Sequence, residues 1–129
     1  MAMDIDSALG IHPRMLALRA RRAEVLARNI ANADTPQYKA RDVDFSRVLD
    51  EARSGLSLTV THPAHLGAGG GPTGIPLAYR VPMQPALDGN TVEPQVERAA
   101  FLDNALRYHA SLRFLDGKVK SILTALRGE

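Results

Sequence analysis

Histidines are the side chains of this sequence best suited to bind a metal ion, and there are four of them. His62 and His65 lie three residues apart in the stretch THPAHL, so two imidazoles could share one ion. The sequence has no cysteine, lacks the HEXXH pattern of zinc proteases and offers no third ligand nearby. His109 falls beside an apolar stripe of helical spacing, where a packed or rim position is expected. We therefore predict no metal site.

Other patterns typical of enzymes are missing or incomplete. Asp42 and Asp44 flank Val43 in ARDVDF, and a solvated or salt-bridged segment is favoured there over general acid–base catalysis. The run GAGGGPTG is rich in glycine, but it lacks the Lys-Ser/Thr ending of a phosphate-binding loop and is followed by proline. No GXSXG nucleophile elbow occurs. We predict a protein that is not an enzyme and needs no cofactor.

A first helix is predicted over residues 11–33. Its apolar residues recur at helical spacing: Ile11, Met15, Leu18, Val25, Leu26, Ile30 and Ala33. A second apolar set that includes Leu16 and Ala23 widens this stripe, so the helix can meet more than one neighbour. The helix is also basic, with Glu24 as its only acid and with Arg14, Arg19, Arg21, Arg22 and Arg28. Two partners fit this charge: the acidic faces of neighbouring subunits, which we favour, or a membrane or nucleic acid.

A second helix is predicted over residues 94–126, where the periodic signal is strongest. Its apolar residues alternate spacings of four and three, which favours a left-handed supercoil: Phe101, Ala105, Tyr108, Leu112, Leu115, Val119, Ile122 and Leu126. The turn sequence DGN and Pro94 precede it, and Gly128 closes it.

Between the helices the periodicity fades. Residues 43–53 could form a short helix, and residues 56–60 alternate like a short strand. Residues 67–85 are rich in glycine and proline and are expected to form a loop that is mobile or ordered only on contact. The predicted fold class is therefore mainly α, with long terminal helices packed as a coiled-coil-like pair and at most short strands in the middle. The predicted divisions are residues 1–35, 36–92 and 93–129.

The stretch NIANADTPQYKARDVDF, residues 29–45, contains the end of the first helix. Pro36 pushes Thr35 out of the right-handed helical region, so the helix must stop at about residues 33–35. The carboxamides of Asn29 and Asn32 can bond to carbonyls of the last turn or to a partner chain. Tyr38 offers a flat ring with a polar tip, and an extended, charged segment follows.

Here the sequence resembles a known family. NIANADTPQY is similar to the NIANANTPGY-type signature of the flagellar axial proteins, which build the rod, hook and hook–filament junctions, and KARDVDF resembles the proximal-rod members. The resemblance continues through THPAH, DGNTVE and NALRYHASLRFLDGKVKSI, and it covers nearly the whole chain. Gln37 departs from the signature, where glycine is usual. If the backbone there needs a positive φ, glutamine is strained.

The resemblance implies a structural subunit of the bacterial flagellar basal-body rod, a helical tube that transmits torque. Its implied partners are other copies of itself, other rod proteins, the adaptor at the membrane-ring end of the rod and, transiently, the flagellar export apparatus, with no nucleic acid. The expected contact residues are Met15, Leu18, Leu26, Asn29, Ile30, Asn32, Thr35, Pro36, Tyr38, Phe101, Tyr108, Leu112, Leu115, Val119, Ile122 and Leu126.

Composition and the N-terminal sequence fit this implication. The formal charge is +2, from 16 Lys and Arg against 14 Asp and Glu, which is too balanced to indicate a nucleic-acid binder by itself. The N-terminus MAMDIDSALG has neither the basic region nor the apolar run of a cleaved signal peptide. We expect a soluble protein that is exported to the rod, in the periplasmic space, without cleavage. The alternative is a basic amphipathic-helix protein that binds membrane or nucleic acid.

Overall fold

The computed structural model describes residues 8–54 and 75–128. It contains two long helices, α2 (His12–Ala31) and α4 (Pro94–Arg127), with the strands β1 (Arg41–Val43) and β2 (Leu77–Tyr79) and the helix α3 (Phe45–Ser54) between them in sequence. The fold is mainly helical, as predicted. The short strand expected at residues 56–60 and most of the Gly-rich stretch lie outside the described residues.

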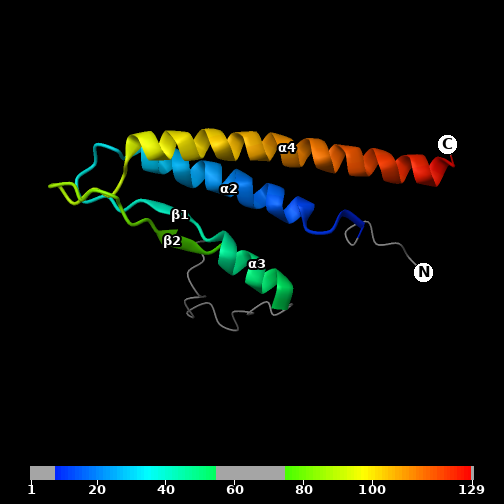
Figure 1. Ribbon diagram of the computed structural model, residues 1–129, viewed down its shortest axis with the longest axis horizontal. Helices are drawn as coiled ribbons and strands as arrows, with labels where there is room; N and C mark the ends of the chain where they lie inside the picture. Colours follow the sequence, from blue (N-terminus) through cyan, green and yellow to red (C-terminus); the bar gives the residue numbers. More distant parts are fainter. Residues whose placement is uncertain (1–7, 55–74, 129) are drawn as a thin grey trace.

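The two long helices run antiparallel and side by side (Figure 1). Each begins with a proline in its first turn, a position where the missing N–H costs no helical hydrogen bond. Gly128 ends α4 in the left-handed conformation, with φ of 71°, as its sequence position predicts. α4 has 34 residues and α2 has 20, so the C-terminal part of α4 extends past the start of α2 (Figure 1).

α2 ends two residues before the predicted limit. The Asn32 side-chain nitrogen donates to the Arg28 carbonyl at 2.8 Å, and this bond competes with continuation of the helix. Thr35 Oγ1 then donates to Asn32 Oδ1 at 3.1 Å, which holds the turn that follows. The prediction that an Asn carboxamide caps the last turn is therefore confirmed for Asn32.

A small two-stranded sheet, made of β1 and β2, and α3 form a second layer on the side of α2 away from α4 (Figure 1). β1 and β2 pair antiparallel, with Val43 opposite Leu77 and Arg41 opposite Tyr79. The main apolar cluster lies between this layer and α2. It is formed by Leu18, Val43 and Val48, with Met15, Phe45, Ile75 and Leu77 packed against them.

The short helix predicted at residues 43–53 is observed as α3, which starts two residues later. Asp44 stands just before it, and its Oδ1 accepts hydrogen bonds from Ser46 Oγ at 2.6 Å and from the Arg47 backbone N–H at 3.2 Å. The side-chain bond from Ser46, followed by the backbone bond, lowers the pKa of Asp44. A carboxylate at this position caps the helix and satisfies one of its free N–H groups.

Within the described residues, no helix combines the length and the apolar content needed to cross a membrane. These residues also contain no group of three metal-ligating side chains. His62 and His65, considered above as a metal pair, lie outside the described residues.

Candidate assembly surface and the polar network beneath it

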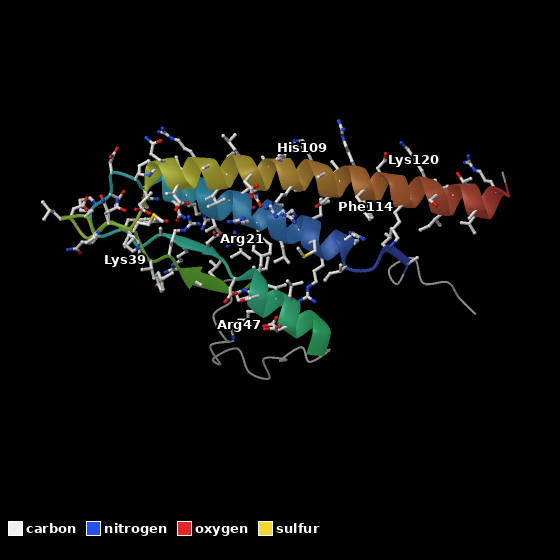
Figure 2. The ribbon with its side chains drawn as sticks, in the orientation of Figure 1. Arg21, Lys39, Arg47, His109, Phe114 and Lys120 are labelled. Atoms are coloured by element: carbon white, nitrogen blue, oxygen red, sulfur yellow. The ribbon has the colours of Figure 1, made fainter. Side chains whose placement is uncertain are left out.

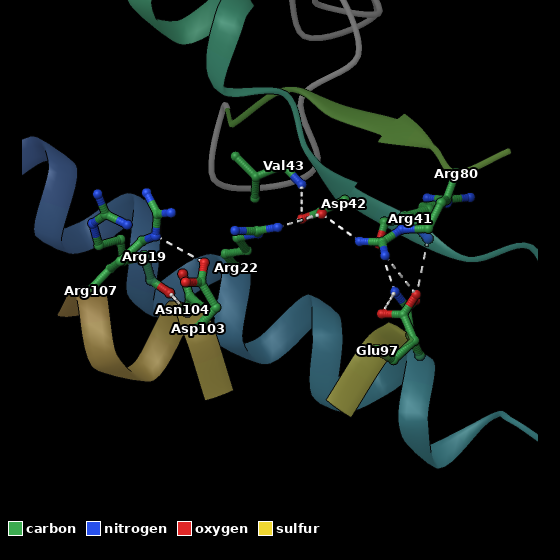
Figure 3. Close-up of polar contacts among 11 residues, drawn as sticks. Arg19, Arg22, Arg41, Asp42, Val43, Arg80, Glu97, Asp103, Asn104 and Arg107 are labelled. Atoms are coloured by element: carbon green, nitrogen blue, oxygen red, sulfur yellow. Dashed lines mark hydrogen bonds and ion pairs between the residues drawn. The ribbon is translucent and has the colours of Figure 1, made fainter. Parts of the chain in front are cut away.

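Asp42 on β1 lies at the centre of a network of charged side chains that joins the two-stranded sheet to α2 (Figure 3). Arg22 Nε and Nη2 donate to the two Asp42 oxygens, both at 2.9 Å, in the bidentate geometry that favours arginine over lysine. Arg80, just after β2, donates to Asp42 from its Nη2 atom. The hydrogen bonds that Arg22 donates to Asp42 raise the pKa of Arg22. The salt-bridged role predicted for this aspartate is confirmed.

Glu97 extends the network to α4 and is fully buried. Its Oε1 lies 3.2 Å from Arg80 Nη1, and its Oε2 accepts a hydrogen bond from Asn29 Nδ2 at 3.1 Å. Asn29 Nδ2 also donates to the Arg41 carbonyl at 2.7 Å, and Asn29 Oδ1 accepts from the Arg41 N–H at 3.3 Å. Asn29 therefore holds the start of β1 against both long helices, a different role from the helix-capping one that the sequence suggested.

Asn90, in the segment before α4, closes the end of α2. Its Nδ2 donates to the carbonyls of Asn32, Ala33 and Thr35 at 3.1, 2.8 and 2.9 Å. These carbonyls follow the last helical turn, and those of Asn32 and Thr35 also accept turn bonds from the N–H groups of Thr35 and Tyr38. The DGN turn thus both precedes α4 and caps α2.

The loop between α2 and β1, residues 32–40, contains the end of the family signature, and we call it the signature loop. Its residue Gln37 lies in the left-handed region, with φ of 61°. Its backbone N–H donates to the Asp88 carbonyl at 2.9 Å, and the Thr91 N–H donates to the Tyr38 carbonyl at 3.0 Å. These bonds hold the strained residue in place. The positive φ considered from the family signature is therefore present here, although this chain has glutamine instead of glycine.

The seam between α2 and α4 contains a second buried amide. Asn104 is 1% exposed, and its Nδ2 donates to the Arg19 carbonyl at 2.9 Å, whereas its Oδ1 has no hydrogen-bond partner among the described residues. Burial, together with the charges of Arg107 and Arg22, lowers the pKa of Arg19. Further along the seam, the rings of His12 and Phe114 lie 4.8 Å apart.

Beside this seam, one face of α4 presents apolar side chains to solvent. Leu112, Val119, Leu123 and Leu126 are 43%, 38%, 45% and 73% exposed. They are separated by seven, four and three residues, so they share one face of the helix. We call these four residues the flank stripe.

A shallow hollow of about 290 Å³ continues this face toward the start of α4. Its walls include Ala20 and Ala23 of α2 and Ala105 and Tyr108 of α4. His109 stands at its edge and is exposed, pointing away from α2 (Figure 2). Small side chains leave room for a residue from another helix. We call this space the alanine hollow.

The predicted contact residues fall into three groups by their burial. Leu18, Leu26 and Asn29 are 3%, 0% and 0% exposed, so their side chains hold the single chain together. The half-buried ones are Met15, Ile30, Asn32, Tyr38, Phe101, Tyr108, Leu115 and Ile122. The exposed ones are Thr35, Pro36, Leu112, Val119 and Leu126, and these are accessible to a neighbouring chain.

Sequence reasoning missed the polar residues that organise the site. Glu97 and Asn104 are seven residues apart, with Phe101 between them at heptad spacing, and this pattern could have placed them in the seam. An interpretation based on apolar residues alone passes over both. Arg80 has no signal of this kind, because only the pairing of β1 with β2 brings it to Asp42.

Part of the basic face predicted for the first helix is paired within the chain. The side chains of Arg21 and Arg22 are 16% and 19% exposed, and they pair with Glu24 and Asp42. Arg22 therefore has its partner within the chain, and pairing with neighbouring subunits stays a prediction for exposed arginines such as Arg14 and Arg28. The alternative of a basic amphipathic-helix protein that binds membrane or nucleic acid is not supported.

Comparison with known proteins agrees with the resemblance. The family model described as "Flagella basal body rod protein" matches residues 15–39. The "Flagellar basal body rod protein FlgB" of Aeromonas hydrophila is 48% identical over 132 residues, which cover 100% of this chain and 99% of that protein. The proteins of the same name from Escherichia coli K12 and from Cereibacter sphaeroides ATCC 17029 are each 46% identical. The alignment with the Escherichia coli protein covers 95% of this chain and 95% of that protein, and the alignment with the Cereibacter sphaeroides protein covers 94% of each.

Proposed function

The chain belongs to the flagellar basal body rod proteins and is a structural subunit of the basal-body rod, and we propose that it assembles there through its two long helices. Members of this family are structural proteins rather than enzymes. The proposed neighbours are further copies of this chain and other rod proteins. In this proposal the helices form a helical tube that transmits torque, in the periplasmic part of the basal body.

The observation that carries the proposal is the apolar face formed by the flank stripe and the alanine hollow. Full burial of a leucine or valine side chain is worth about 1.5 to 3 kcal/mol, and these four keep 38% to 73% of their surface exposed, so covering them contributes to association. The contact is heterologous if this face meets a different surface of the next chain. Repeated heterologous contacts that do not close generate a helical array, which suits a rod.

The proposal extends to the route into the rod. We propose that the flagellar export apparatus carries the chain out without cleavage and that the adaptor at the membrane-ring end of the rod is a further neighbour. The comparisons cover nearly the full length of the chain, which supports a role like that of the relatives. Mass spectrometry of purified basal bodies tests this directly, because the chain should be present with its first residues intact.

Leu112→Asp tests the assembly surface. Leu112 is already 43% exposed, so the monomer should fold, with its far-UV circular dichroism unchanged. A charge on the flank stripe should prevent packing against a neighbour, and we expect loss of swimming and absence of the chain from basal bodies. Leu112→Met is the matched control, because it keeps an apolar side chain of similar volume and should swim normally. Normal swimming of the Leu112→Asp strain would contradict the proposal.

Leu115→Asp provides a second test at a position closer to the seam. Leu115 is half-buried, so this variant should lose stability as well as assembly. If the Leu115 variant fails while the Leu112 variant swims, the helix pair matters only for folding of the single chain. The assembly surface would then have to lie elsewhere.

A further inference from the structure

A second hollow, of about 350 Å³, lies between the C-terminal half of α2, the signature loop and the two-stranded sheet. Four cationic side chains line it, and two tyrosines stand among them: Arg21, Arg28, Lys39, Arg41, Tyr38 and Tyr79. None of the described residues that line it is an Asp or a Glu. We call this space the cationic hollow. Figure 2 shows Arg21 on the side of α2 that faces the two-stranded sheet, and Lys39 beyond this sheet toward the loop end of the molecule.

The positive charge of the cationic hollow is held in place mostly by neutral partners. Lys39 Nζ donates to the Gly89 carbonyl at 2.7 Å. Arg41 Nη2 donates to the Tyr79 hydroxyl at 3.0 Å, and the Arg41 guanidinium lies 4.9 Å from the centre of the Tyr79 ring. These bonds fix the positions of two cations without cancelling their charge.

The other two cations differ from each other. Arg21 forms an ion pair with Glu24 on the same helix, and Arg28, about two turns after Arg21, is exposed at the end of α2. Three of the four cations thus face the hollow without a carboxylate partner among the described residues. Like charges that line one hollow repel one another, and a bound anion would relieve that repulsion.

We propose that the cationic hollow receives an acidic segment of a neighbouring basal-body chain, with at least two carboxylates close together in its sequence. The inference rests on the proposed function, because it assigns a second contact to the same rod subunit. Charge complementarity identifies the occupant. An arginine fork pairs with a carboxylate in two parallel hydrogen bonds, and cations that are already oriented lose little side-chain entropy on binding.

A long polyanion or a membrane surface fits this hollow less well. Such partners need positive charge that continues over a stripe or a plane. On the exposed part of α4 the charges alternate in sign instead, in the pairs Arg107 with Asp103 and Lys120 with Asp116. The cationic hollow, in contrast, is a recess that holds only a few side chains.

The test uses the amine of Lys39 as a reporter in intact basal bodies. The sequence has only three lysines, at positions 39, 118 and 120, so each gives a distinct product. A carbodiimide joins an amine directly to a carboxylate that touches it. We expect mass spectrometry to find Lys39 linked to an Asp or Glu of another chain, with a second carboxylate within about four residues, the reach of one helical turn. The product should diminish when salt is raised to about 1 M before treatment.

Variants of single cations sharpen the test. Arg28→Gln should lower the yield of the Lys39 product about twofold to fivefold, as expected for one exposed ion pair, and Arg28→Glu should lower it further. Arg113→Gln, on an exposed part of α4, is the control and should leave the yield unchanged. Lys39→Arg keeps the charge but lacks the amine, so the product should vanish, which shows that the linked amine is that of Lys39.

Four outcomes would overturn the inference. Lys39 could give no product with another chain although Lys118 or Lys120 does. Its partner segment could lack a second carboxylate, or Arg28→Glu could leave the yield unchanged. Vesicles of phosphatidylglycerol or inorganic phosphate could also protect Lys39 of the purified chain better than a glutamate-rich peptide does, and the hollow would then belong to another class of ligand. The first three outcomes are read in basal bodies that contain the chain, and the fourth concerns the purified chain, so all four leave the rod assignment intact. Absence of the chain from basal bodies would refute the proposed function itself.

Discussion

Glu97 shows how one carboxylate can join elements that are distant in the sequence. It is fully buried on α4, and it contacts Arg80 beyond β2 and Asn29 near the end of α2. A buried carboxylate is costly unless it is paired and hydrogen-bonded, and here each oxygen has a polar neighbour. The pairing of Glu97 with Arg80 and Asn29 therefore specifies one position of the two-stranded sheet relative to the two helices.

Glu97→Ala should destabilise the chain by about 2 to 4 kcal/mol. It leaves Asn29 without one of its bonds and Arg80 without one of its two carboxylates, and it opens a cavity in the interior. Urea unfolding followed by far-UV circular dichroism measures the effect. Asp103→Ala is the control on the same helix, because Asp103 is 50% exposed in its pair with Arg107 and should matter by less than about 1 kcal/mol. Equal unfolding midpoints for the two variants would contradict this account.

At the scale of the elements, local rules predicted the helices well. Pro94 and Gly128 mark the two ends of α4, and Pro36 placed the end of α2 to within a few residues. These signals are backbone effects that act between neighbours in the sequence, so no tertiary contact is needed to recognise them. β1 and β2 were not predicted as a pair. Their partners are separated by more than 30 residues, and each strand has only three.

The register of α4 was predicted only in part, for a physical reason. The predicted apolar series contains Phe101 and Leu115, which are half-buried, but also Leu112 and Leu126, which are exposed. The seam also uses polar side chains such as Glu97, whose burial depends on partners from other elements. An apolar pattern cannot reveal such positions, and the apolar residues of the flank stripe were placed in the same series as the seam.

Two glycines, one inside α4 and one just after its last residue, should change the stability of the chain differently when each is replaced by alanine. Gly117 lies inside the helix, and a Cβ there meets nothing within 4 Å, so Gly117→Ala should stabilise the helix by about 0.5 to 1 kcal/mol. Gly128 also has open space around it, but its φ of 71° disfavours alanine, and Gly128→Ala should stabilise nothing and shorten the helix. Thermal unfolding of both variants measures the difference. A stabilisation of similar size for both would show that the C-terminal cap is not formed in solution.

At the scale of the whole molecule, the stability is unevenly distributed. The part of α4 that lies beside α2 is anchored by Glu97 and Asn104, whereas the part beyond Phe114 extends past the start of α2 (Figure 1). Most of the flank stripe, including Val119 and Leu126, belongs to this second part. An isolated helical segment of about 12 residues is marginal in water unless another surface covers its apolar face.

Amide hydrogen exchange should therefore divide α4 into two regions. In the free chain we expect residues 116–127 to exchange at least about tenfold faster than residues 97–111, because local opening there breaks few contacts. In purified basal bodies the difference should disappear, since a neighbouring chain would cover the flank stripe. Leu112→Asp should leave the pattern of the free chain unchanged, as Leu112 is already exposed. Equal protection along α4 in the free chain would mean that the helix is stable alone, and assembly would then gain nothing from ordering it.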